Sequence, residues 1–166
     1  MEHVGDGGVT YTPLEERNLK VVRQFFGEEE GPTDKSELFA EDGAWWNGLP
    51  LIPGAEGRTE HRGRDAIRLL LPSQKAGPRR AGLDPYDLPT MRAEDVLVLA
   101  DGDHVVRQQT FRARTVSGRD YANTYCFVFR FDRDGRIVYL TEHWNTWHAH
   151  RTLFDHFDVE PAHPGG

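Results

Sequence analysis

Two apolar-rich runs joined by an Asp-Gly dipeptide constrain the fold of this chain more than any other feature. The segment 121–147 reads YANTYCFVFRFDRDGRIVYLTEHWNTW, with Asp134 and Gly135 between the two runs. A type I′ turn needs positive φ at both central residues, so Asp-Gly between alternating runs is a strong hairpin signal. The sequence therefore predicts two long antiparallel strands, 121–131 and 137–147.

The register of this hairpin decides which side chains share a face. A two-residue loop at Asp134-Gly135 brings three cross-strand pairs onto one face: Phe127 with Glu142, Tyr125 with Trp144, and Asn123 with Thr146. That face carries aromatic rings, an amide and a single carboxylate, although burying an unpaired charge is costly. A turn with a bulge shifts the register by one residue and places His143 there instead, so both assignments stay open.

Upstream of the hairpin, helix signals come first and strand signals follow. Thr12 is a candidate N-cap for a helix that starts at Pro13, and apolar residues recur at helical spacing until about Gly27. Two shorter helices are predicted at 33–39 and 64–71. Four further strands are predicted at 44–46, 58–62, 91–100 and 104–116.

Helices first and a long antiparallel sheet after them indicate the α+β class. A chain of 166 residues is most simply one domain, which we expect over 13–157 between a flexible arm (1–12) and a tail (158–166). A last helical turn or two is expected within 148–157. Residues 72–90 are rich in Pro and Gly and predict a mobile lid at the mouth of a pocket.

Charge and composition narrow the classes of partner. The formal net charge is −7 at pH 7, which argues against a nucleic-acid-binding surface. Cys126 is the sole cysteine, so no internal disulfide is possible. No apolar run approaches the ~20 residues of a membrane span, and the N-terminus lacks the features of a secretory signal. We therefore expect a cytoplasmic protein that binds neither nucleic acid nor membrane.

Eight histidines raise the question of a metal site. His143, His148 and His150 lie close together in the sequence, but no HExxH motif, paired cysteine or typical zinc spacing accompanies them. A P-loop, a nucleophile elbow and a GxGxxG fingerprint are also absent from the sequence. We expect neither a metal nor a cofactor.

Four short segments resemble those of one protein family. They are Leu38-Phe39-Ala40-Glu41-Asp42-Gly43, the pair Asn123 and Tyr125, Asp134-Gly135-Arg136-Ile137, and Glu142 with Asn145 three residues later. In these segments and in its order of elements, the chain resembles the nuclear-transport-factor-2-like superfamily with its SnoaL-type polyketide cyclases, and most closely the phenazine-biosynthesis A/B proteins. The likeness covers about 14–155. It implies a cone-shaped fold in which N-terminal helices pack on a strongly curved antiparallel sheet around an internal pocket.

The resemblance also implies a catalytic residue. In the phenazine-biosynthesis proteins a strand-end Glu is the proposed acid/base residue of the pocket, and its position corresponds to Glu142. Packing against Phe127 and Trp144 would remove water from the carboxyl group, and this disfavours the charged form and raises the pKa. Such a group exchanges protons near neutral pH.

Other polar and aromatic residues are candidates for substrate binding. An orienting or anion-binding role is open to five of them: Asn123, Tyr125, Gln108, Thr110 and Arg112. Gln109 and Phe111 occupy the alternate face of the strand 104–116, so the register of that strand stays open. Asp42 is either a second acid in the pocket or a local capping residue. Trp45 and Trp46 point to opposite sides, and Trp46 is the one assigned to the site.

These observations predict a cofactor-free enzyme of specialised metabolism that acts on a small organic molecule by acid/base proton transfer. The reaction classes are isomerisation, cyclisation, dehydration and condensation, with Glu142 moving the proton and Tyr125 and Asn123 orienting the substrate. The alternative is a protein of the same fold that only binds a ligand or serves as a scaffold. We also expect a homodimer, because outward-facing apolar residues such as Cys126 and Val128 need cover.

Overall fold

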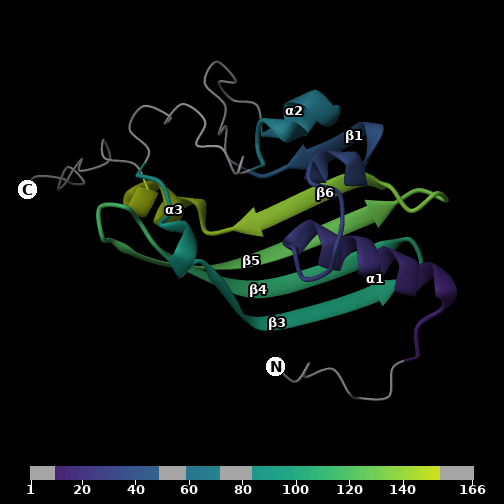
Figure 1. Cartoon of the computed structure of the whole chain (residues 1–166), viewed down its shortest axis with the longest axis horizontal. Coiled ribbons are helices and arrows are strands. Elements are labelled where there is room, and N and C mark those ends of the chain that lie inside the picture. The colour runs from purple at the N-terminus through teal and green to yellow at the C-terminus, as the bar shows by residue number, and fades with distance from the viewer. Residues whose placement is uncertain (1–9, 49–58, 72–83, 154–166) are drawn as a thin grey trace, which may run out of the picture.

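A six-stranded sheet in the order β2-β1-β6-β5-β4-β3 forms the body of the computed structural model, which describes residues 10–48, 59–71 and 84–153 (Figure 1). Four strands follow one another as antiparallel neighbours: β3 (Arg92–Asp101), β4 (His104–Arg114), β5 (Asp120–Phe131) and β6 (Ile137–Trp144). β1 (Phe39–Trp46) pairs with β6, and the short β2 (Glu60–Arg62) lies at the edge.

Short helical segments connect and cover these strands. They are α1 (Pro13–Phe26), η1 (Lys35–Leu38), α2 (Arg64–Arg68), η2 (Leu88–Thr90) and α3 (Thr146–Leu153). The first helix begins as predicted, because Thr12 and Glu15 form a reciprocal capping box ahead of Pro13. It ends at Gly27, whose φ of 75° lies in the left-handed region that favours glycine.

The predicted α+β class is confirmed, with two differences in the sheet. β1 runs parallel to β6, so the sheet is mixed rather than wholly antiparallel. The strands β2 to β5 lie between these two in the sequence, and so long a connection allows the chain to return in the same direction. Within the described residues the sheet is open, with β2 and β3 as its two edge strands. Two sequence predictions fall outside the described residues. They are the domain end at 157 with the tail 158–166, and residues 72–83 of the expected lid.

The register predicted for the hairpin of β5 and β6 is confirmed, although the turn differs. Phe127 pairs with Glu142 and Tyr125 with Trp144. The turn holds three residues (133–135) rather than two, since the Asp132 amide donates to the Arg136 carbonyl, and this alone would shift the register by one. A bulge between Arg130 and Phe131 in the ladder shifts it back by one and restores Glu142 to the inner face.

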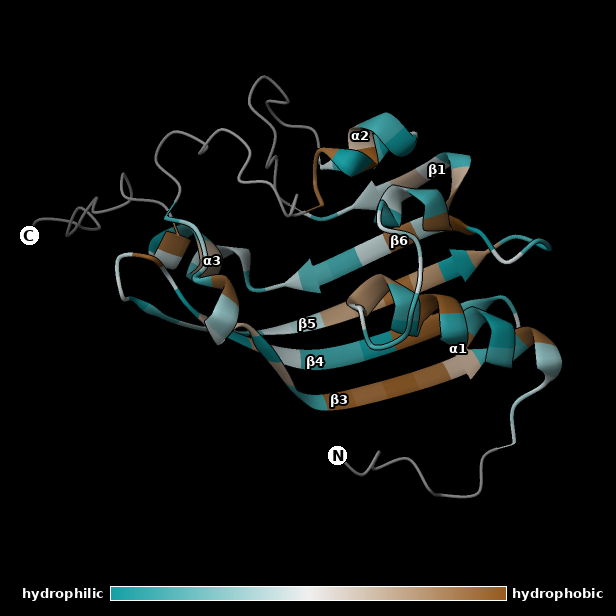
Figure 2. Cartoon of the chain, in the orientation of Figure 1, coloured by the Kyte–Doolittle hydropathy of each residue, from teal (hydrophilic) through white to brown (hydrophobic). Residues whose placement is uncertain are grey.

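The hydrophobic core lies between α1 and the inner face of the sheet. Alternate residues of β5 point inward and place four rings in a row: Tyr125, Phe127, Phe129 and Phe131. Phe25 of α1 packs edge-on against Phe129 at 5.5 Å between ring centroids. Figure 2 shows an apolar run along most of β3, and its outward residues Leu97 and Leu99 are 48% and 50% exposed.

Candidate functional site

A cavity of about 710 Å³ opens between the end of α1 and the inner faces of β1, β4, β5 and β6. Its size suits a small organic ligand. Aromatic side chains form a large part of its wall: Phe25, Phe26, Trp45, Tyr86, Phe111, Tyr125 and Phe127. Among the described residues, the sheet supplies Gln109, Glu142 and the phenol of Tyr125 as polar groups to this wall, and Thr33, Asp34, Lys35 and Arg68 lie at the side of η1 and α2.

Glu142 faces this cavity from β6, as the predicted hairpin register requires. Burial disfavours its charged form and raises the pKa to about 8, and a hydrogen bond from the indole of Trp45 opposes this shift. The Trp45 Nε1 donates to Oε2 of Glu142 at 3.0 Å. No Lys, Arg or His of the described segments lies within ion-pair distance of this carboxyl group. Glu142 is thus an unpaired acid that can exchange a proton near neutral pH.

Tyr125 also lines the cavity, whereas Asn123 lies behind it. The Asn123 Nδ2 donates to the hydroxyl of Tyr121 at 2.9 Å, and that hydroxyl lies 2.8 Å from the hydroxyl of Tyr125. Asn123 also holds the end of β6 through two hydrogen bonds with the backbone of Asn145. Asn123 therefore positions the tyrosine pair and does not contact the cavity.

Burial raises the pKa of Tyr125 and of Tyr121, so both phenols stay protonated at neutral pH. Tyr86 behaves in the same way, and its ring packs 5.2 Å from that of Tyr121. Trp144 stacks on Tyr125 at 5.3 Å, and its indole donates to the carbonyl of Asn47 at 2.6 Å. Phe127 lines the cavity as predicted, while Trp144 supports the wall from behind.

The assignment of Gln108, Thr110 and Arg112 to the site is wrong, because β4 presents its alternate residues to the cavity. Gln109 lies opposite Tyr125 of β5, and this pairing fixes the phase of the whole strand. Gln108 is exposed, Thr110 lies 3.4 Å from a carboxylate oxygen of Asp95, and Arg112 pairs with Glu94 at 2.6 Å. Gln109 and Phe111 take their place in the cavity wall.

Two further assignments are corrected at β1. Trp45 points into the cavity, so the alternation of side chains places Trp46 on the other face, where it packs 5.1 Å from the ring of His143. Asp42 is exposed, and its backbone carbonyl accepts a hydrogen bond from Arg62. The second acid of the pocket is therefore absent from this position.

Most cavity residues were not assigned to the site from the sequence, among them Trp45, Tyr86, Gln109 and Phe111. Gln109 and Phe111 share one face of β4, and this was the sequence signal for them. The opposite face, with Gln108, Thr110 and Arg112, was the alternative chosen because those residues are polar. Tyr86 lies in the segment 72–90 predicted to edge the pocket, and both Tyr86 and Leu88 contact the cavity.

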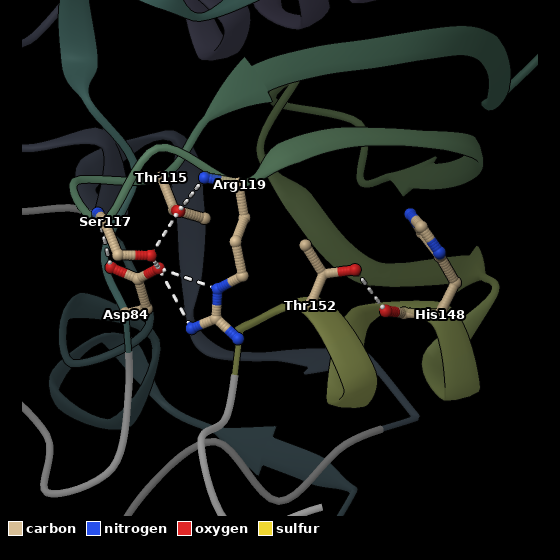
Figure 3. Close-up of polar contacts among 6 residues, drawn as sticks. All are labelled: Asp84, Thr115, Ser117, Arg119, His148 and Thr152. Carbon is tan, nitrogen blue, oxygen red and sulfur yellow. Dashed lines mark hydrogen bonds and ion pairs between the residues drawn. The ribbon is translucent and has the colours of Figure 1, made fainter. Parts of the chain in front are cut away.

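Asp84 anchors the segment that carries Tyr86 and Leu88 (Figure 3). Its carboxylate accepts hydrogen bonds from the Ser117 hydroxyl at 2.5 Å and from the Arg119 guanidinium at 3.0 and 3.1 Å. Burial alone would raise its pKa, but the hydrogen bonds from Ser117, Thr115 and Arg119 outweigh burial and lower the pKa to about 2. The carboxylate thus ties this cavity segment to the turn between β4 and β5.

We expect Asp84→Asn to lower the free energy of unfolding by about 2 kcal/mol at pH 7. The folded-state pKa is lowered from 3.8, so this stabilisation is present above about pH 4 and is lost as the pH falls through about 2. Urea denaturation at pH 7 and at pH 3 measures both effects. Asp120→Asn is the control, because the Asp120 side chain is 88% exposed and its substitution should change little. Equal stability of Asp84→Asn and wild type at pH 7 would contradict the anchoring role.

Within residues 10–48, 59–71 and 84–153, no group of three or more His, Cys, Asp or Glu side chains is placed to hold a metal ion. The helices of these segments are all too short or too polar to cross a membrane.

Comparison with known proteins gives the same fold. The model of the SnoaL-like domain family matches residues 28–140. A phenazine biosynthesis-related protein from Pseudomonas aeruginosa superposes with a TM-score of 0.62 at 19% identity, over 99% of this chain and 96% of that one. A protein assigned as a SnoaL-like polyketide cyclase from Jannaschia sp. CCS1 gives 0.62 at 16% identity, over 93% of this chain and 100% of that one.

A more distant neighbour is an LEH-like epoxide hydrolase from M. tuberculosis, with a TM-score of 0.56 at 17% identity over 84% of this chain and 90% of that one. No functionally curated protein matches the sequence significantly. At these identities the structural neighbours establish the fold alone, because one fold hosts many chemistries.

Proposed function

This chain belongs to the SnoaL-like domain family, and from that premise we propose that it converts a small organic molecule by moving a proton within the cavity. One observation carries the proposal: Glu142 is an acid without a cationic partner among the described residues, in an aromatic cavity, with a pKa of about 8. Near neutral pH both protonation states of such a group are populated. It can take a proton from carbon and return it elsewhere on the same molecule.

The surrounding groups support this use of Glu142. The hydroxyl of Tyr125 stays protonated and lines the cavity, so it can orient an oxygen atom of the substrate. The aromatic walls exclude water, which strengthens each polar contact inside. Trp45 holds the carboxyl group in place through the hydrogen bond at 3.0 Å. No step of this scheme requires a cofactor.

We assign the reaction to the class of isomerisation, cyclisation, dehydration or condensation. These reactions share proton abstraction beside a carbonyl group, followed by reprotonation or loss of a leaving group. The names of the structural neighbours, which include a polyketide cyclase, a phenazine biosynthesis-related protein and an epoxide hydrolase, agree with conversion of small molecules. Cytoplasmic location and a place in specialised metabolism remain part of the proposal.

Deuterium exchange tests the proposed activity without knowledge of the natural substrate. The probe is 2-acetylnaphthalene, an aromatic ketone with exchangeable protons beside its carbonyl group. In D₂O at neutral pH, proton NMR should show loss of the methyl signal in the presence of the wild-type protein. If the ketone binds but exchanges no faster than in buffer, the alternative of a binding protein without turnover replaces the proposed enzyme.

We also propose that the protein is a homodimer through the outer face of the sheet. Leu97 and Leu99 of β3 are about half exposed, and Val106, Cys126 and Val128 continue the apolar surface across β4 and β5. Burial of such a patch by a second copy would remove it from water.

Light scattering at micromolar concentration should give about twice the chain mass of 18.9 kDa. Leu99→Lys should shift the population toward the monomer, because a charge at the centre of the interface opposes its burial. Met91→Lys, at a partly exposed position that lines the cavity, should leave the mass unchanged. A wild-type mass near 18.9 kDa would rule out the dimer.

A further inference from the structure

The inner face of β4 carries a buried charge that the proposed proton transfer does not use. The Arg107 side chain is 1% exposed, and its guanidinium lies 4.0 Å from the centre of the Phe26 ring. It forms two hydrogen bonds with the carboxylate of Glu28, at 2.9 and 2.5 Å. A buried guanidinium persists only where its N–H groups are paired, and Glu28 satisfies those of two of its nitrogens.

The third nitrogen of this guanidinium determines the orientation of Gln109. The Arg107 Nε donates to Oε1 of Gln109 at 2.7 Å. An N–H group requires an oxygen acceptor, so this contact fixes which end of the amide faces Arg107 and prevents the flipped arrangement. The amide nitrogen Nε2, with its two donors, is therefore the end left for other partners.

Gln109 presents that nitrogen at the cavity. The residue is 5% exposed and forms part of the cavity wall. Within the described segments, no acceptor receives a hydrogen bond from its Nε2. This nitrogen is not among the fully buried atoms without a partner, so its N–H groups are accessible from the cavity and can donate to a ligand oxygen. The charge on Arg107 polarises the amide and makes its N–H groups stronger donors.

We propose that Gln109 is the hydrogen-bond donor for a carbonyl oxygen of the substrate, and that Arg107 is the positioning residue that holds the amide in the donating orientation. This inference rests on the proposed function and narrows the substrate to a carbonyl compound. Gln109 holds the oxygen while Glu142 takes the proton from the adjacent carbon. The negative charge that develops on the oxygen then meets a preorganised N–H donor.

Two isosteric probes separate the hydrogen bond from apolar contacts. The ketone 2-acetylnaphthalene and the hydrocarbon 2-isopropenylnaphthalene have nearly the same shape, but only the ketone accepts a hydrogen bond. Calorimetry gives the affinity ratio, which is the affinity for the ketone divided by that for the hydrocarbon. Infrared spectroscopy of the ¹³C-labelled ketone reports the carbonyl stretch of the bound ketone. Gln109→Leu should lower the affinity ratio roughly 3- to 10-fold and move the carbonyl band to higher wavenumber.

Further variants test the arrangement around the amide. Gln109→Glu keeps an acceptor for Arg107 but removes the N–H donors, and it should lower the affinity ratio as Gln109→Leu does. Arg107→Lys should broaden the carbonyl band, because the amide is no longer held in one orientation, with little change in hydrocarbon affinity. Gln108→Leu is the matched control: the same residue type, one position away, on the opposite face of β4. It should leave the ratio and the band unchanged.

Each result decides one part of the proposal. An unchanged affinity ratio and band in Gln109→Leu would overturn the donor role of Gln109. An unchanged band in Arg107→Lys would overturn the positioning role, and Gln109→Leu still tests the donor role if Arg107→Lys does not fold. Failure of the wild type to bind either probe would instead overturn the proposed function, on which this inference rests.

Discussion

Glu142→Gln should lower the rate of proton transfer by roughly two to four orders of magnitude, while ligand affinity changes little. Glutamine keeps the shape of the side chain and an acceptor for the indole of Trp45, but it cannot exchange a proton at neutral pH. The apolar contacts of the cavity supply most of the binding, and the substitution leaves them in place. The readouts are deuterium exchange into 2-acetylnaphthalene and calorimetry with the same ketone.

Although Glu142→Gln should be slower than the wild type, it should be more stable at neutral pH. The folded-state pKa of Glu142 is raised from 4.5 to about 8, so the folded protein binds the proton more tightly than the unfolded chain. The free energy of unfolding therefore falls as the pH rises from about 4.5 to about 8. Glu142→Gln removes this loss and should stabilise the protein by up to about 3 kcal/mol at pH 7, less where water enters the cavity.

The control for both effects is Glu41→Gln, the same substitution at an exposed position of β1. It should change neither the exchange rate nor the pH dependence of stability. Tyr125→Phe and Asn123→Ala should give smaller rate losses than Glu142→Gln, because these residues orient groups and do not transfer the proton. Wild-type exchange in Glu142→Gln would remove Glu142 from the mechanism.

The second large effect is expected at Glu28. Glu28→Gln should lower the free energy of unfolding by about 2–3 kcal/mol, because it leaves the buried guanidinium of Arg107 without its carboxylate. Loss of one partner of a fully buried pair costs more than this, but the Glu28 side chain is 37% exposed and water compensates in part. Thermal unfolding should show a melting temperature lower by roughly 5–10 °C.

Glu30→Gln provides the comparison for this effect. Glu30 lies two residues further along the same acidic run and is exposed, and its side chain makes no ion pair with the described residues. Its substitution should alter stability by no more than about 0.5 kcal/mol. If Glu28→Gln and Glu30→Gln have the same melting temperature, the Arg107–Glu28 pair does not stabilise the wall of the cavity.

The features that could be predicted from the sequence are those determined by residues close together in the chain. The capping box at Thr12 and the two runs around Asp134-Gly135 are local, and both led to the observed elements. The placement of Glu142 on the inner face was also correct, but the two-residue turn behind it was not. The longer turn and the ladder bulge each shift the register by one residue, and the two shifts cancel. Neither feature changes the alternation of apolar and polar residues, so the sequence pattern does not reveal it.

The face of β4 could not be decided from pattern alone. Its inward residues include Arg107 and Gln109, and its outward residues include Val106, so the strand lacks a clean polar and apolar alternation. The inward charge is compensated by Glu28, which lies 79 residues away in the sequence. Such a partnership forms only in the folded chain, so the sequence pattern favoured Gln108, Thr110 and Arg112 instead.

The most direct test of the account is the pKa of Glu142 in the free protein. Infrared difference spectra across a pH titration, with Glu142→Gln as the reference, isolate the carbonyl stretch of the protonated Glu142 carboxyl group. We predict that this band persists at pH 6 and titrates away with a midpoint at about pH 8. Titration near pH 4.5, the ordinary value for a solvated glutamate, would contradict the claim that this cavity holds an acid poised for proton transfer.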